Sequence, residues 1–262
     1  MNIIYFPNKL GQLKDGLQNS LKILNSIINK PIDVVSCDNS IKDKLYENLS
    51  NLYKTNLKYN KKINIGGDHS MAIASVAESL NRYPENLKVL WFDAHPDINT
   101  YTASCSKSVH GMPLAYLTKL DSDTRFSYIK NKLDFKNLLY IGIRDIDEFE
   151  EEIIRKYNIE FIKSEEINKN PELCLEKIKN FIKNDPVHMS FDVDCMDPSI
   201  IPSTGTPVKN GLKLQQTSFI LNNILFYNIV NIDITELNFE IGSKKDQENS
   251  INNFLYLFSN IL

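Results

Sequence analysis

Residues 89–97 read Val-Leu-Trp-Phe-Asp-Ala-His-Pro-Asp, and this stretch decides the fold more clearly than any other part of the chain. Its first four residues are apolar without alternation, which is typical of a strand buried on both faces of a parallel sheet. Polar residues follow at once, where such a strand would end. Ligands of open α/β sheets bind beyond the carboxyl ends of the strands. The stretch therefore predicts a parallel sheet with a functional site at one edge.

The rest of the chain repeats this alternation of short apolar runs with amphipathic segments. Besides Val89–Phe92, the candidate strands are Ile3–Phe6, Lys62–Ile65, Leu138–Ile143, Ile159–Ile162, Val187–Asp192 and Ile229–Ile234. Segments with apolar residues at helical spacing lie at residues 17–28, 171–182, 214–225 and 247–262. This order predicts a three-layer α/β/α sandwich with a mainly parallel central sheet. Because no linker, repeat or low-complexity tract divides the chain, residues 1–262 are expected to form a single domain.

The composition indicates which classes of partner to expect and in which cellular compartment the protein lies. Hydrophobic residues make up 42% of the 262 residues, and the net charge of -3 comes without a dense basic patch, so no nucleic-acid partner is expected. No apolar run approaches the ~20 residues that a membrane span needs, so no membrane partner is expected. The four cysteines are widely spread without a CxxC pair. Free thiols in a reducing cytoplasm are the simplest interpretation.

Polar side chains with metal-binding chemistry follow four of the predicted strands. These segments are GGDHS at residues 66–70, DAHPD at 93–97, DVDCMDP at 192–198 and DITE at 233–236. Residues two apart on an extended chain point the same way, so Asp93 and His95 can share a target, as can Asp192 and Asp194. Carboxylates that converge without a Lys or Arg between them repel one another unless cations compensate them. Two imidazoles with four carboxylates are about right for two ions, and this oxygen-rich set suits Mn²⁺.

Each of these motifs has an ordinary structural explanation when it is taken alone. Gly-Gly and Asp-Pro pairs are common in turns, and an Asp at a strand end often caps the next helix. His188 is interpreted in this way, as a residue at the start of a strand. The whole set is different, because a purely structural cluster would leave its buried charges uncompensated.

The motifs taken in series resemble the signatures of the arginase/agmatinase ureohydrolase family. The resemblance extends from Ile63 to Gly242 and rests on Gly67–Ser70, Asp93–Asp97, His110-Gly111, Ser190–Asp194 and Asp197-Pro198. It implies an arginase-like fold and the hydrolysis of a guanidinium C–N bond with release of urea. It also implies two Mn²⁺ ions per chain. Their ligands would be His69, Asp93, His95, Asp97, Asp192 and Asp194.

Within that metal site, the resemblance assigns a place to each ligand. Asp93 and Asp192 would bridge the two ions, with His69 on one ion and with His95 and Asp194 on the other. The ions would lower the pKa of a water between them, so that hydroxide attacks the guanidinium carbon near neutral pH.

The resemblance also implies three catalytic residues. Glu236 would pair with the guanidinium nitrogens, a contact for which a carboxylate has the right geometry. His110 would pass a proton to the leaving amine, which an imidazole can do near neutral pH. Asp97 would serve the reaction as well as the metal.

The identity of the guanidino substrate divides this family. Asp97–Thr100 resembles the arginase branch, in which Ser104 and Ser106 would bind the α-carboxylate of arginine. The residues expected to bind substrate are Asn99, Ser104, Ser106, Asp147, Glu150 and Thr206. The expected reaction is the hydrolysis of L-arginine to L-ornithine and urea, in a homo-oligomer.

Three departures from the family leave other interpretations open. Ser104 stands where arginases usually have Thr, Phe239 stands where the family usually has Pro, and Gly11–Leu17 keeps only part of a Gly-rich pattern. Agmatine, hydrolysed to putrescine and urea, or another guanidino acid is therefore the alternative substrate. A catalytically silent metal-binding homologue is expected to lose a ligand or Glu236, and the sequence keeps them all. A deacetylase would need a mononuclear ligand set, against which the DAHPD motif argues.

Overall fold

The computed structural model describes residues 1–262 and contains one eight-stranded sheet in which all neighbouring strands are parallel. The strands are β1 (Asn2–Tyr5), β2 (Ile32–Val34), β3 (Lys62–Ile65), β4 (Lys88–Phe92), β5 (Leu138–Ile141), β6 (Glu160–Ile162), β7 (Val187–Asp192) and β8 (Ile229–Thr235). Their order across the sheet is β2-β1-β3-β8-β7-β4-β5-β6. The predicted parallel sheet is confirmed.

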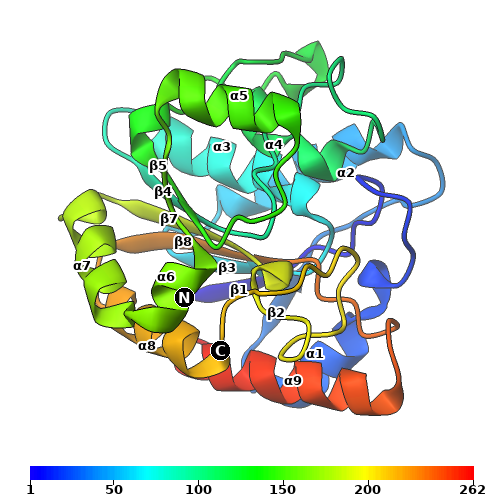
Figure 1. Cartoon of the computed structure of the whole chain (residues 1–262). Coiled ribbons are helices and arrows are strands. Elements are labelled where there is room, and N and C mark those ends of the chain that lie inside the picture. The colour runs from blue at the N-terminus through cyan, green and yellow to red at the C-terminus, as the bar shows by residue number, and fades with distance from the viewer.

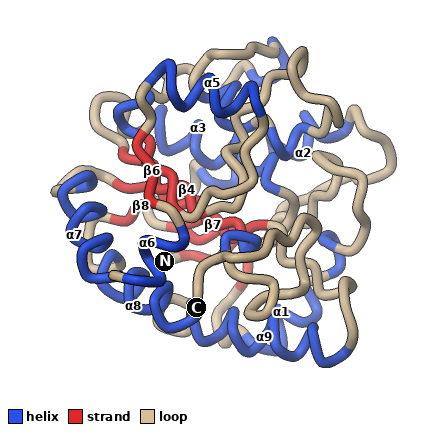
Figure 2. The backbone as a smooth tube through the Cα atoms, viewed as in Figure 1, coloured by secondary structure: helices blue, strands red, loops and turns tan.

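Helices cover both faces of this sheet, as Figures 1 and 2 show. One face is covered by α2 (Lys44–Asn56), α3 (Ala72–Arg82), α4 (Pro113–Leu117) and α5 (Glu148–Tyr157). The other is covered by α1 (Leu21–Ile27), α6 (Ser164–Lys169), α7 (Pro171–Ile182), α8 (Leu214–Ile224) and α9 (Lys244–Phe258). Successive side chains of β4 enter opposite cores, with Val89 and Trp91 on the first side and Leu90 and Phe92 on the second. This arrangement confirms the three-layer α/β/α sandwich.

The strands agree closely with their predicted bounds, with two informative exceptions. The strand expected over Leu138–Ile143 ends at Ile141, because Gly142 has a φ of 97° and turns the chain out of the sheet. Strand β2 was not predicted, since its three residues are only partly buried or exposed and include Asp33.

The helical segments differ more from the prediction at their ends. The segment 17–28 is a 3₁₀ turn at Leu17–Asn19 followed by α1. The last helix starts at Lys244, three residues before the predicted start, because Ser243 and Asp246 form a reciprocal capping box there. Asn170 caps α7 by accepting a hydrogen bond from the Leu173 N–H, as the sequence indicated.

The four strands that carry the polar motifs lie side by side at the centre of the sheet, in the order β3-β8-β7-β4. Because all are parallel, their carboxyl ends meet at one edge, and the segments that follow them converge there. Short 3₁₀ turns follow β3 and β7, at His69–Met71 and Val193–Cys195, each capped by an Asp side chain. None of the helices is both long and apolar enough to cross a membrane.

Candidate active site

A first group of metal-ligand side chains surrounds the buried imidazole of His69. Its Nδ1 lies 3.0 Å from Asp93 Oδ2, 2.9 Å from Asp97 Oδ2 and 3.2 Å from Asp192 Oδ2. On the other side of the ring, Nε2 is 2.8 Å from Ser190 Oγ. Nδ1 itself has no hydrogen-bond partner although it is buried. If Nε2 carries the ring proton and donates it to Ser190, the lone pair of Nδ1 faces three carboxylates, an arrangement that fits a bound cation.

A second group lies next to the first and shares Asp93 with it. His95 Nδ1 is 3.1 Å from Asp194 Oδ2 and 3.4 Å from Asp93 Oδ1. Asp93 therefore turns one oxygen toward each imidazole. The ligand atoms of Asp93, His95 and Asp194 all lie within 4.8 Å of one another, as do those of His69, Asp93 and Asp97. The structure thus brings together all six side chains that were predicted to bind metal.

The cluster holds four carboxylates and only two imidazoles, so its own imidazoles cannot compensate all of its negative charge. Burial and the charge of the neighbouring Asp93 together raise the pKa of Asp97 to about 6. Burial likewise raises the pKa of Asp192 and Asp194, and the adjacent carboxylates add to the effect. No Lys or Arg forms an ion pair with Asp93, Asp97, Asp192 or Asp194. Oxygen ligands with two imidazoles suit divalent cations that accept both kinds of ligand.

Glu236 and His110 form a pair beside the metal-ligand cluster. His110 Nδ1 lies 3.2 Å from Glu236 Oε1, which also accepts a 2.9 Å hydrogen bond from the His69 N–H. Gln12 donates to the other carboxylate oxygen. Burial alone would lower the pKa of His110, but the hydrogen bond and charge of Glu236 raise it to about 9. The Glu236 carboxylate thus favours the protonated form of the His110 imidazole.

Two of the site carboxylates stand on strained backbone. Asp97 has a φ of 50° and Glu236 a φ of 62°, in the left-handed region that residues with a side chain rarely adopt. Such a conformation costs of order 1–3 kcal/mol and persists only where surrounding contacts hold it. The Glu236 N–H donates to Gly67 O at 3.0 Å, and Asp97 O accepts from the Leu114 N–H at 3.0 Å. These contacts direct both carboxylates toward the site.

A cavity of about 230 Å³ opens above the cluster. Its walls are formed by His95, Asp97, Asn99, His110, Gly111, Asp145, Asp147, Glu150, Asp192, Asp194 and Thr206. Four of the six predicted substrate-binding residues are in this set, and Ser104 and Ser106 are not. These two serines lie in the loop that follows, where their Oγ atoms are 3.4 Å apart and accept from the Lys107 and Ser108 N–H groups.

The outer wall of the cavity is acidic. Asn99 donates a 2.6 Å hydrogen bond to Asp147, and Asp147 and Glu150 form the capping box at the start of α5. Burial, together with the charge of Asp147, raises the pKa of Glu150 to about 8. Thr206 Oγ1 donates to Asp194 Oδ2 at 2.9 Å. Since no Lys or Arg lines the cavity, its outer part suits a cationic ligand group.

Three residues that contact the metal-ligand cluster, and one that contacts Glu236, were not predicted. Ser190 bonds His69, Trp91 donates to Asp93 Oδ2 at 3.0 Å, and Asp145 lies 3.5 Å from His95 Nε2. The strand alternation could have revealed Ser190 and Trp91, since each stands two residues before a predicted ligand. Gln12 binds Glu236 from 224 residues away, and no local pattern marks it.

The comparison with known proteins agrees with this geometry. The arginase family matches the chain over residues 11–255. The chain belongs to the arginase family.

Individual members of the family show how far the similarity reaches. The arginase of Neurospora crassa is 39% identical over 196 residues, which cover 70% of this chain and 55% of that protein. The chain thus spans little more than half the length of the fungal arginases that it matches. The arginase of Entamoeba histolytica is 30% identical over 97% of this chain and 96% of its own length. The crystal structure of that arginase with L-ornithine superimposes with a TM-score of 0.89 at 28% identity, covering 98% of this chain and 97% of the other.

Proposed function

We propose that residues 1–262 act as one catalytic domain that hydrolyses L-arginine to L-ornithine and urea with two Mn²⁺ ions. The observation that carries this proposal is the pair of ligand groups that share Asp93 and leave His69 Nδ1 facing carboxylates. Membership of the arginase family and the names of the similar proteins support the same reaction. The residues that would hold the ions are His69, Asp93, His95, Asp97, Asp192 and Asp194.

The chemistry that two bound divalent cations supply is the activation of water for attack on the guanidinium carbon near neutral pH. The protein binds and orients the substrate for this attack. The Glu236 carboxylate accepts hydrogen bonds from the guanidinium nitrogens, since the two planar groups match in shape and charge. Its oxygens are already aimed into the site by the contacts with His69 and Gln12.

Departure of the amine requires a proton, and we infer that His110 supplies it. Its imidazole lines the cavity and carries a positive charge at neutral pH because of Glu236. When a guanidinium group pairs with Glu236, the proton at His110 Nδ1 becomes free for the leaving nitrogen.

The residues that line the cavity bear on whether the substrate is arginine or agmatine. The Asp145 and Asp147 carboxylates suit the ammonium group that both molecules carry at the end remote from the guanidinium, and Glu150 lines the same wall. The α-carboxylate of arginine needs donors, and of the three residues expected to supply them Asn99 lines the cavity. Because Ser104 and Ser106 do not line the cavity and no cation does, agmatine is the second candidate.

A urea-release assay with excess Mn²⁺ tests the function and separates the substrates. We expect kcat/KM for arginine to exceed that for agmatine by on the order of 10²-fold, since donors built for a carboxylate are left unpaired by agmatine while water offsets part of the loss. The double variant Asn99→Ala with Ser106→Ala should then weaken arginine turnover much more than agmatine turnover. Equal turnover of both substrates by the wild type would assign the protein to agmatine. No urea from either would overturn the proposed function.

Two further predictions of the sequence stay open to experiment. A homo-oligomer is expected, and sedimentation of the purified protein at several concentrations tests it. A cytoplasmic location is consistent with four free cysteines, and fractionation of the source cells would test it.

A further inference from the structure

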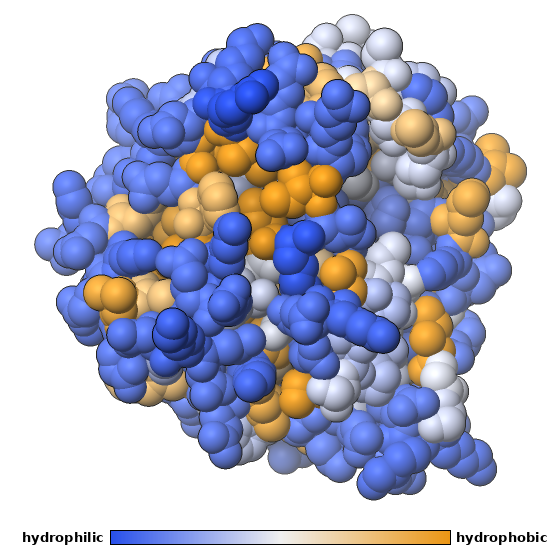
Figure 3. All heavy atoms as spheres, in the orientation of Figure 1, coloured by the Kyte–Doolittle hydropathy of each residue, from blue (hydrophilic) through white to orange (hydrophobic).

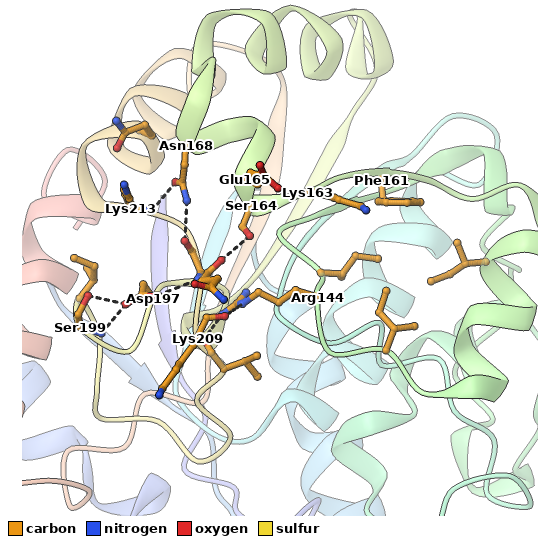
Figure 4. A pocket seen from close by; sticks show the side chains of 18 of the residues that line it. Arg144, Phe161, Lys163, Ser164, Glu165, Asn168, Asp197, Ser199, Lys209 and Lys213 are labelled. Atoms are coloured by element: carbon orange, nitrogen blue, oxygen red, sulfur yellow. Dashed lines mark hydrogen bonds between the residues drawn. The ribbon is translucent and has the colours of Figure 1, made fainter.

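Arg144 lies in the segment between β5 and α5, directly behind the cavity wall. Figure 4 shows its side chain reaching toward the loop that carries Lys209. All hydrogen-bond acceptors of its guanidinium group are main-chain carbonyl oxygens. They belong to Gly142 (3.0 Å), Asp194 (2.8 Å), Cys195 (3.2 Å), Met196 (3.4 Å), Val208 (2.7 Å) and Lys209 (3.1 Å).

These carbonyls come from three segments that each supply groups to the site. The turn at residues 194–196 carries the ligand Asp194. The loop that holds residues 208–209 carries Thr206, whose hydroxyl donates to the Asp194 carboxylate. The segment of Arg144 itself continues to Asp145, the neighbour of His95. One guanidinium group therefore joins the main chains behind the second ligand group.

Only an arginine can make this set of contacts. A guanidinium group carries five N–H donors in one plane, whereas a lysine ammonium has three donors on one atom. With Lys at this position, contacts to two of the three segments would be lost or lengthened. The main chain next to Asp194 would then have carbonyls without a donor and more freedom to move.

We propose that Arg144 is a positioning residue for the ion held by Asp93, His95 and Asp194, and that it acts through the main chain of Asp194 and through the loop of Thr206. This inference rests on the proposed function. The first ligand group is expected to be independent of Arg144, because His69 is oriented by Ser190 and by Trp91, which stacks on its ring at 4.2 Å.

A second pocket, of about 1710 Å³, includes Arg144 in its lining, so solutes can reach this side chain. Its lining includes apolar residues on β6 and α5, such as Phe161 and Ile154. Figure 3 shows apolar side chains gathered on this face, near α5. A free guanidinium ion can therefore reach the space left by a truncated Arg144.

The test is the number and affinity of Mn²⁺ ions in the protein, measured by mass spectrometry after dialysis against graded Mn²⁺. Arg144→Lys should keep one ion at wild-type affinity and bind the other about 10- to 100-fold more weakly, the range seen when partners of metal ligands are altered. In Arg144→Ala, added guanidinium chloride should restore the second ion in part. Arg155→Lys, an exposed arginine of α5, is the matched control and should keep both.

Three results would overturn the inference. Arg144→Lys could retain both ions at unchanged affinity, or it could lose both in parallel, which would indicate a general structural role. If neither Arg144 variant folds, Thr206→Val serves instead, because it removes the hydrogen bond from the Thr206 hydroxyl to the Asp194 carboxylate. Unchanged affinity of this variant for both ions would be the third contrary result. Failure of the proposed function is distinct, because the wild-type protein itself would then bind no pair of ions or release no urea.

Discussion

Two buried clusters of the molecule contain the same residue types, His and Asp, but differ in how these side chains are paired. One is the site beyond the carboxyl ends of the strands, and the other is a polar network between α3 and strands β3, β7 and β8. In the network, His188 Nε2 lies 3.0 Å from Asp233 Oδ2, and His188 Nδ1 lies 2.9 Å from Ser79 Oγ. Asp233 also accepts from Asn64 at 2.7 Å and from Ser75. Every polar atom of this His–Asp pair has a partner.

The site has no such balance. Four aspartates meet two imidazoles, and the one fully buried imidazole presents a nitrogen without a hydrogen-bond partner. The pKa of Asp233 is lowered, because His188 and the hydrogen bonds outweigh its burial, whereas the pKa of Asp192 is raised. A surplus of carboxylates with an unpaired lone pair, rather than the presence of His and Asp, therefore marks a cation site.

The same substitution in both clusters should give opposite results, and this is the largest effect we predict. Asp93→Asn removes the charge shared by both ligand groups, so we expect loss of bound Mn²⁺ and at least roughly a 10²-fold loss of urea release. Asp233→Asn should keep both ions and the activity but lose about 1–3 kcal/mol of unfolding free energy, the cost of leaving buried hydrogen-bonding groups without a matching partner. Metal analysis and thermal melting distinguish the two. An Asp93→Asn protein that keeps its metal would contradict the comparison.

A smaller loss of activity is expected from a change at Glu236, whose charge is proposed to act on the substrate and not on the metal ions. Glu236→Gln should fold and bind both ions, but its turnover should fall by about 2–5 kcal/mol of transition-state stabilisation, because the charged pair with the guanidinium is gone. Steady-state kinetics on metal-loaded protein measure this loss. A variant with most of the wild-type activity would remove Glu236 from the reaction.

The smallest effect concerns the pH dependence of stability. The pKa of Glu150 in the folded protein is about 8, above its ordinary value of 4.5, so the folded state binds this proton more tightly than the unfolded state does. Glu150 should therefore lower stability progressively as pH rises from 4.5 to 8, with the full penalty above that pH. Glu150→Gln should gain melting temperature relative to the wild type over this range, by a few degrees. Glu152→Gln, on the exposed side of the same helix, is the control, and equal slopes for both variants would contradict the assignment.

The parts of the fold that could be predicted are those that depend on a pattern within a short stretch of sequence. Continuous apolar runs such as Val187–Asp192 can be satisfied only inside a covered parallel sheet, and they specified the central strands. None of the three residues of the short edge strand β2 is fully buried, so β2 has no continuous apolar run that would predict it. Gly142 ended β5 early through its positive φ, which an apolar run does not show.

The site divides in the same way. The six ligand side chains stand in short motifs at strand ends, so the topology alone brings them together. Gln12 and Arg144 reach the site through contacts between segments far apart in the sequence, and such contacts carry no local pattern. For Ser104 and Ser106, the spacing from Asp93 was readable, but the path of the loop that places them outside the cavity wall was not.

The most direct test of the central claim is the metal content of the wild-type protein. The claim is that the carboxylate surplus around His69 and His95 is compensated by two divalent cations. We predict that protein dialysed against Mn²⁺ and then freed of unbound metal contains two Mn²⁺ ions per chain, and that Asp233→Asn contains the same number. One ion or none per chain in the wild type, measured by elemental mass spectrometry, would contradict this account of the site.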